Sequence, residues 1–235
     1  MVRRPLALAL LALLSLLALA CSSAPKAPPA HEHSFAFLRT GPRRAEYSGE
    51  PLQALMKGHM DNIGRLAERE ELLLAGPFGQ GNPDPALRGV FLFATPDAAA
   101  GAKLCETDPS IAAGVFEIEV VPLSTRKDLV ASLHRHQAFE ERRKADPTIP
   151  MMEGMSSYVL GIASDAARAG RALEPLRAAG QVVLEAQLGG AREGELLFVL
   201  DQRDLAGAEA ALAPVAADLG EYKAYPWFGS AFLRE

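Results

Sequence analysis

Hydrophobic and polar residues along 35–122 follow two periods, one typical of strands and one of helices. Between 48 and 68, apolar side chains recur every 3.6 residues, which predicts an amphipathic helix. The segment 115–123 alternates apolar and acidic residues, as a half-buried strand does. Three short apolar runs are typical of buried strands: 35–39, 72–77 and 90–95. With a second helix after residue 95, the order is strand, helix, strand, strand, helix, strand.

Capping residues predict where the two helices begin and end. Ser48 can cap the first helix, with Pro51 in its first turn. Thr95 is expected to cap the second helix, with Pro96 at its first position. Pro109 disfavours a helical conformation at Asp108, so this helix should end there.

Residues 158–228 repeat this order with weak identity but similar spacing. The segment "VVLEAQLGG" corresponds to "LLLAGPFGQ", and "GELLFVLD" corresponds to "GVFLFATP". Two copies of a βαββαβ unit are therefore predicted, each with two helices on one face of a four-stranded antiparallel sheet. The free faces of the two sheets can then pack together.

The predicted units divide the chain into a first domain (35–126), a helical linker (127–157) and a degenerate second repeat (158–235). His134 and His136 lie on the linker helix. Because they are two residues apart, they do not share a helix face, and we expect them at the surface or half-buried.

The first 20 residues are predicted to be a signal peptide. Arg3 and Arg4 precede an apolar run that is too short for a membrane span. The ending "LALAC" resembles a bacterial lipoprotein signal, which implies lipidation of Cys21 and a membrane as partner. The alternative is an ordinary signal peptide cleaved near Ala20. Residues 21–34 are rich in Ser, Pro and Ala and are predicted to be a flexible tether, with His31 and His33 exposed.

This leader predicts export to the cell envelope. Ser22 and Ser23 stand where inner-membrane lipoproteins often carry an aspartate, which slightly favours the outer membrane. With Cys21 lipidated, Cys105 is left without a partner. We expect a small buried hydrophobe there, rather than a catalytic thiol.

Composition excludes few functions, but it argues against a nucleic-acid footprint. The net charge is −5, and the globular part holds no basic cluster. The glycine-rich "GQGNPDP" lacks the Lys-Ser/Thr of a phosphate loop, and no spacing typical of metal ligands occurs. We therefore expect neither a cofactor nor a metal.

Two segments, "HMDNIGRLAEREELLLAGP" and "TDPSIAAGVFEIEVVPL", resemble the signature segments of YCII-related (YciI-like) proteins. The resemblance covers roughly residues 35–123. It implies a ferredoxin-like α+β fold related to the dimeric α/β barrels, with the tandem repeat forming the pair of sheets within one chain. One branch of the family resembles enzymes that remove chloride from a chlorinated hydroquinone, with a His and an Asp proposed as an acid/base pair.

Carried over, the family histidine falls on His59, the Asp-Pro aspartate on Asp108, and the "AGP" turn on Gly76 and Pro77. The family often has Arg-Pro before the histidine. Met56 and Lys57 stand there in this chain, and Lys57 could partly replace the guanidinium. In the second repeat, the two slots fall near Ala169 and Leu212, which cannot exchange protons.

Each candidate residue also has a structural interpretation. His59 shares its helix stripe with apolar residues, so it could simply pack in the core and hydrogen-bond a carbonyl. Asp108 could simply form a helix-ending Asp-Pro turn. The sequence thus leaves two hypotheses. The favoured one is a binding module for a small molecule or a protein, including self-association. The alternative is a cofactor-free lyase or dehalogenase-like enzyme that uses His59 and Asp108 for proton transfer.

Overall fold

A computed structural model describes residues 30–234. The predicted signal peptide, Cys21 and most of the predicted tether lie outside the described residues. The strands are β1 (His31–Thr40), β2 (Leu72–Pro77), β3 (Leu87–Phe93), β4 (Phe116–Thr125), β5 (Met155–Ala163), β6 (Val182–Leu188), β7 (Leu196–Leu200) and β8 (Tyr222–Ser230). The helices are α2 (Gly49–Glu68), α3 (Ala98–Glu106), α4 (Pro109–Ala112), α5 (Leu129–Ala145), α6 (Ala166–Ala172), α7 (Glu174–Ala178), α8 (Leu205–Leu212) and α9 (Ala216–Leu219).

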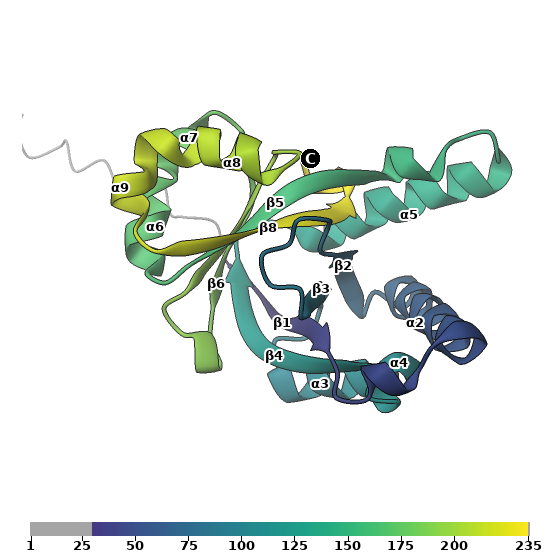
Figure 1. Cartoon of the computed structure of the whole chain (residues 1–235). Coiled ribbons are helices and arrows are strands. Elements are labelled where there is room, and N and C mark those ends of the chain that lie inside the picture. The colour runs from purple at the N-terminus through teal and green to yellow at the C-terminus, as the bar shows by residue number, and fades with distance from the viewer. Residues whose placement is uncertain (1–29, 235) are drawn as a thin grey trace, which may run out of the picture.

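The eight strands form one antiparallel sheet in the order β2-β3-β1-β4-β6-β7-β5-β8. Within each half, the second strand lies outermost, followed by the third, the first and the fourth, which is the ferredoxin-like order. The predicted fold class, two tandem βαββαβ units paired as an intrachain α/β barrel, is therefore confirmed. Figure 1 shows the two halves with their helices on opposite sides of the strands.

The two halves are joined at two places, one in the middle of the sheet and one between its outer strands. The fourth strand of the first half, β4, pairs with β6 at Leu123–Leu188. The fourth strand of the second half, β8, approaches β2, where Phe78 and Trp227 form an antiparallel bridge. The Gly79 amide also donates to the Pro226 carbonyl over 2.7 Å. Each junction thus joins the fourth strand of one half to the second strand of the other, so the sheet curls into a nearly closed barrel.

Alternation along the strands separates a shared interior from two outer layers. Phe35 and Phe37 point into the barrel, where they join buried residues from both halves. Ala36 and Leu38 point outward, to a layer with Phe91, Phe93 and residues of the first-half helices. Trp227, with 2% of its surface exposed, belongs to the shared interior. The interior therefore depends on both halves being present.

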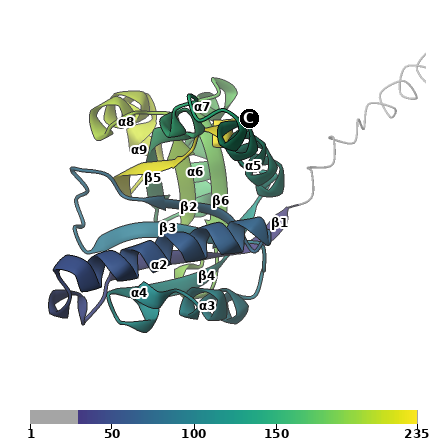
Figure 2. The ribbon, with the colours of Figure 1, turned by 90° about the vertical axis from the view of Figure 1, so that its right-hand side faces the viewer.

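Helices cover the outer faces of both halves. In Figure 2, α2 lies alongside the strands, in contact with β2, and α3 and α4 lie next to β4. The linker helix α5 packs against β2 as well, beside α2. On the second half, α6 to α9 enclose a separate apolar layer. Among the described residues, no helix combines the length and the apolar character that a membrane span requires.

Two local details differ from the sequence-based expectations. The first strand begins at His31, because residues 31–34 pair with β4, and so the last part of the predicted tether is sheet. The second helix begins after Asp97 rather than Thr95. The Asp97 carboxylate accepts from the Ala99 amide over 2.8 Å, and Pro96 lies before the helix. Asp and Thr are both good capping residues, because each side chain can accept from a free amide in the first turn of a helix. The sequence alone therefore does not decide between Thr95 and Asp97 as the cap.

His33 is buried in β1, and neither of its ring nitrogens has a hydrogen-bond partner. Burial lowers its pKa from 6.5, and nearby His31 adds to this effect. The backbone of Ala94 and Phe93 and the charge of Glu32 oppose the shift without cancelling it. The native state therefore holds this imidazole in its neutral form.

We predict that His33 makes the protein less stable in acid. The unfolded chain takes up a proton near the ordinary histidine value of 6.5 and the folded chain only below it, so the free energy of unfolding falls as the pH drops below 6.5. Urea unfolding of wild type and His33→Leu across this range should show the variant gaining stability relative to wild type as the pH falls. His134→Leu, at a half-exposed histidine on α5, is the matched control, and an equal acid gain there would contradict the prediction.

The junction between β2 and β8 leaves no room for a side chain at Gly76. A Cβ atom there would overlap the Phe228 carbonyl oxygen and lie 2.7 Å from Trp227 Nε1. We predict that Gly76→Ala lowers the free energy of unfolding by about 1–3 kcal/mol, because β2 and β8 must move apart to make room for the methyl group. Gly64→Ala is the control: it lies on the exposed face of α2 with open space around it, and it should stabilise by up to about 1 kcal/mol. Equal responses in chemical denaturation would contradict this account of the junction.

Candidate functional site

His59 lies on the buried stripe of α2 together with Asn62 and Leu66. Its ring packs on the outer face of the first-half sheet, with centroids 5.8 Å from Phe91 and 5.3 Å from Phe116. Only 11% of its side chain is exposed. The imidazole is thus held between a helix and a sheet by aromatic contacts, as the helical periodicity predicts.

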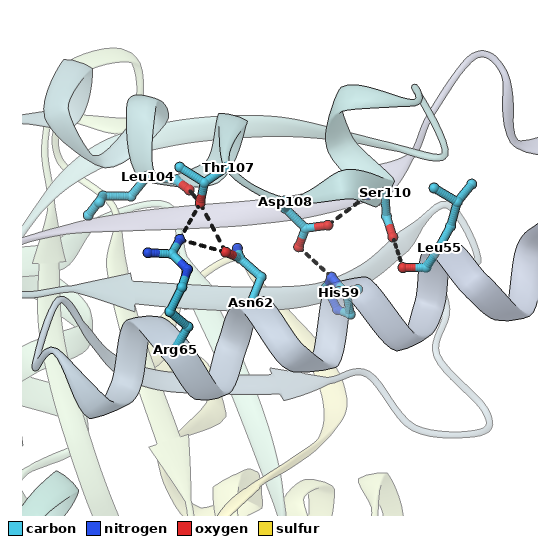
Figure 3. A network of polar contacts seen from close by, with 8 residues as sticks. All are labelled: Leu55, His59, Asn62, Arg65, Leu104, Thr107, Asp108 and Ser110. Atoms are coloured by element: carbon cyan, nitrogen blue, oxygen red, sulfur yellow. Dashed lines mark hydrogen bonds and ion pairs between the residues drawn. The ribbon is translucent and has the colours of Figure 1, made fainter.

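Asp108 connects α3 to α4 and is fully buried. Its Oδ1 accepts from the Ser110 amide over 2.8 Å and so caps α4. Its Oδ2 lies 2.6 Å from His59 Nδ1 (Figure 3). A carboxylate oxygen accepts, so His59 donates from Nδ1 in this contact, and its Nε2 lies outside it.

The segment around Asp108 is fastened to α2 by further contacts. The Ser110 hydroxyl donates to the Leu55 carbonyl over 3.0 Å. Gly58 lets this segment come close, since a Cβ there would lie 3.0 Å from Pro109 Cγ. One turn further along α2, the Asn62 Oδ1 accepts from Thr107 over 3.1 Å and from Arg65 over 2.7 Å (Figure 3). These contacts hold the two members of the pair in one relative position.

A pocket of about 420 Å³ opens beside His59. It lies between α2 and α5, with β2 and β3 as its floor, and Met155 and Ser230 of the second half complete it. Gly76 and Pro77 of the "AGP" turn are among its lining residues. Its walls are mainly apolar, and its size falls within the range of small-molecule sites. Among the described residues, Nε2 of His59 makes no hydrogen bond and is not sealed from solvent.

The other candidate positions, Lys57 and the two slots of the second repeat, lie outside the pocket. The Lys57 side chain is 76% exposed, forms an ion pair with Asp61 at 2.6 Å, and does not line the pocket. It therefore does not take the place of the family arginine there. At the slots of the second repeat, Ala169 and Leu212 are buried in the apolar layer between helices and sheet. The described part of the second half thus has no counterpart of the His59–Asp108 pair at these positions.

The two linker histidines differ more than the sequence suggests. His134 is about half exposed, and its Nε2 lies 2.9 Å from Glu70. His136 lines the pocket, which the sequence analysis missed. Burial lowers its pKa, whereas the charge of Glu140 and the backbone of Gly154 act in the opposite direction. The two-residue offset did predict that the two rings lie on different faces, but not which face meets the pocket.

Cys105 is buried in the layer between the first-half helices and the sheet. Burial raises the pKa of its thiol to about 12, and the charge of Asp108 acts in the same direction. It is therefore a poor nucleophile, in keeping with its interpretation as a buried hydrophobe. Within residues 30–234, no group of three or more His, Cys, Asp or Glu side chains is arranged to hold a metal ion.

Comparisons with known proteins add little to this geometry. No family model matches the chain, and no curated protein matches it. It resembles a solved protein from Lactobacillus acidophilus NCFM described as a "putative monooxygenase", with 8% identity and a TM-score of 0.47, over 85% of this chain and 94% of that one. The likeness is too low to carry an argument about chemistry, so the site rests on its own geometry.

We predict that Asp108 stabilises the protein through two separable contacts. Asp108→Asn keeps a capping side chain but loses the charged partner of His59, whereas Asp108→Ala loses both. The free energy of unfolding should fall in the order wild type, Asn, Ala, with the Ala variant losing about 2–4 kcal/mol from the cap and the unpaired buried imidazole together.

Asp97→Ala supplies the matched control, because Asp97 caps α3 in the same way without contacting a histidine. It should lose only about 0.5–2 kcal/mol, as caps do. A loss at Asp97 as large as the loss at Asp108 would show that the contact with His59 adds nothing.

Proposed function

We propose that this chain is a duplicated relative of the YCII-related proteins that binds a small, mainly apolar molecule in the pocket beside His59. One observation carries the proposal: the His59 ring, whose Nε2 makes no hydrogen bond among the described residues, lines a mainly apolar cavity of about 420 Å³. A few polar groups placed in an apolar pocket are what orients a small ligand. Asp108 supports this role by holding the ring in one tautomer.

The cellular setting is also a proposal, and it rests on the leader sequence alone. The basic start, the apolar run and Cys21 favour a lipid-anchored protein of the cell envelope, with the outer membrane slightly favoured. A ligand-binding domain on a tether is consistent with such a location. The mildly acidic composition gives no reason to expect nucleic acid as a partner.

A thermal-shift screen of aromatic and aliphatic fragments tests the binding proposal. Fragments that occupy the pocket should raise the melting temperature of wild type and should raise it less in His59→Leu, because the polar contact is lost. His134→Leu, which alters a histidine outside the pocket, is the control and should behave as wild type does. If every stabilising fragment acted equally on wild type and on His59→Leu, His59 would have no part in the site.

A second candidate function is cofactor-free proton transfer, and the 2.6 Å contact between His59 and Asp108 favours it. An imidazole oriented by a carboxylate, with its other nitrogen open to a pocket, can act as a general base. The same geometry serves binding alone, so the contact does not by itself establish turnover.

Deuterium exchange measured by NMR separates the two functions. For pocket-binding ketones found in the screen, an enzyme should speed exchange of the protons next to the carbonyl, and Asp108→Asn should slow this by about 100-fold or more. Binding should persist in that variant. If wild type exchanged these protons no faster than buffer did, the proton-transfer candidate would fail while the binding proposal stood.

A further inference from the structure

Methionine side chains gather around the pocket beside His59. The sequence holds six methionines, of which Met1 lies outside the described residues. Met56 and Met60 line the pocket from the same helix as His59, and Met155 lines it from β5. Met60 remains 60% exposed, so packing in a core does not account for its position. The pocket therefore places thioether sulfurs beside an imidazole.

Met56, His59 and Met60 occupy neighbouring positions on one face of α2. Residues three and four apart on a helix lie next to each other, with Cβ atoms about 5–6 Å apart. Helical side chains also lean toward the N-terminus, so His59 and Met60 extend over the turn that carries Met56. All three line the same pocket. Two sulfurs and one ring nitrogen can therefore approach a single point at the α2 wall.

The contact with Asp108 prepares His59 to bind a metal ion. His59 Nδ1 donates to Asp108 Oδ2 over 2.6 Å (Figure 3), and Nε2 makes no hydrogen bond among the described residues. Histidines that bind metals almost always donate their other N–H to a carboxylate or a carbonyl, which fixes the ring and raises the basicity of the ligating nitrogen. The pair therefore has the arrangement of a metal ligand with its supporting carboxylate.

The lining residues indicate which metal ions suit this position. Among the described residues that line the pocket, none is Asp, Glu or Cys. The oxygen ligands that Mg²⁺ and Ca²⁺ prefer are therefore missing from the lining, as are the thiolates and carboxylates that usually complete a zinc site. Thioethers are soft ligands and favour Cu(I).

Charge favours a monovalent ion in the same way. Both kinds of ligand are uncharged when they bind a metal, and the surroundings are mainly apolar, so a divalent ion would cost more to desolvate than a monovalent one. The buried Asp108 carboxylate lies behind the His59 ring and offsets a single positive charge. Arg88 carries a positive charge on the lining, but its side chain is exposed and donates to the Pro85 carbonyl over 3.5 Å.

We propose that Met56, His59 and Met60 form a site for a soft monovalent metal ion, Cu(I) or Ag(I), at the α2 wall of the pocket, with Asp108 as a positioning residue. Typical metal motifs consist of His, Cys, Asp and Glu, so the sequence raised no expectation of a metal here. The inference goes beyond the proposed function, because the ion needs the α2 wall alone and no organic ligand.

Titration calorimetry with silver nitrate tests the site without a reductant. Every sample is the full chain with Cys21→Ser, because a thiol outside the described residues would also bind Ag⁺. Met56→Leu and Met60→Leu remove a sulfur at nearly constant volume. Partners behind a metal ligand typically contribute about 10–100-fold in affinity, and a ligand contributes at least as much. Each Leu variant and His59→Leu should therefore weaken Ag⁺ binding about tenfold or more, and Asp108→Asn about tenfold.

Met152→Leu is the matched control, because this thioether is 56% exposed and does not line the pocket. It should bind Ag⁺ as the parent chain does. In NMR spectra with labelled methionine methyl groups, Ag⁺ should shift the signals of Met56 and Met60 and leave that of Met152 in place. Cu(I), supplied from a coloured chelator under ascorbate, should show the same order of variants, and excess Zn²⁺ should displace neither ion. Melting temperatures verify that the variants fold.

The outcomes separate this inference from the proposed function. If Met56→Leu and Met60→Leu bind Ag⁺ as tightly as Met152→Leu does, the thioether site is wrong. If Zn²⁺ displaces Ag⁺, the assignment to a soft monovalent ion is wrong. If fragments bind in the thermal-shift screen but Ag⁺ does not bind, the metal site fails and the proposed function stands. If Ag⁺ binds with the expected order of variants and no fragment binds, the proposed function fails and the metal site stands.

Discussion

Every other feature of this molecule depends on the pairing of sheet edges between its two halves. A four-stranded βαββαβ unit has one face covered by its helices and leaves the other face and two strand edges open, which favours aggregation. Here β4 pairs with β6 and β8 closes on β2, so that each half covers the edge of the other. The same arrangement buries both open faces as one interior that includes Phe35, Phe37 and Trp227. Closure thus satisfies backbone hydrogen bonds and buries apolar surface in a single step.

The candidate site is a product of this closure. The His59–Asp108 pair belongs wholly to the first half, but the pocket beside it does not. Its floor strand β2 is the strand that β8 meets, and Ser230 lies at the end of β8. The linker helix α5 supplies a further wall of the pocket. Any change that loosened the junction would therefore displace one wall of the pocket relative to the other.

Periodicity predicted the fold well, because each strand and helix carries a strong local signal. The bounds of β2 agree with the predicted run 72–77. In β4, the alternation after Phe116 places Glu117 and Glu119 on the face away from the helices, where Glu119 accepts from Arg192 over 2.7 Å. The helix start at Asp97 was less predictable, since Thr95 is an equally good capping residue. The beginning of β1 was wrong for another reason: composition marked 31–34 as tether, and only pairing with β4 makes it a strand.

The candidate site was predictable only in part, for a reason of distance along the chain. His59 and Asp108 are 49 residues apart, and a resemblance to a family, rather than any local pattern, placed them in one site. His136 and Ser230 are 94 residues apart, and no motif links them. Their meeting depends on how α5 packs and on where β8 ends, which are properties of tertiary structure. Closeness in sequence is also not enough: Lys57 is only two residues from His59, yet its side chain points to solvent and pairs with Asp61.

The covalent link between the two halves also changes what a single mutation can do. In a barrel made from two identical chains, every substitution occurs twice, so a residue that suits a site must also be tolerated at the symmetry-related position. In this chain, Ala169 and Leu212 pack in apolar surroundings at the slots where the first half carries an imidazole and a carboxylate. One half can therefore specialise as scaffold while the other varies its chemistry. The pocket beside His59 is accordingly built from residues of both halves.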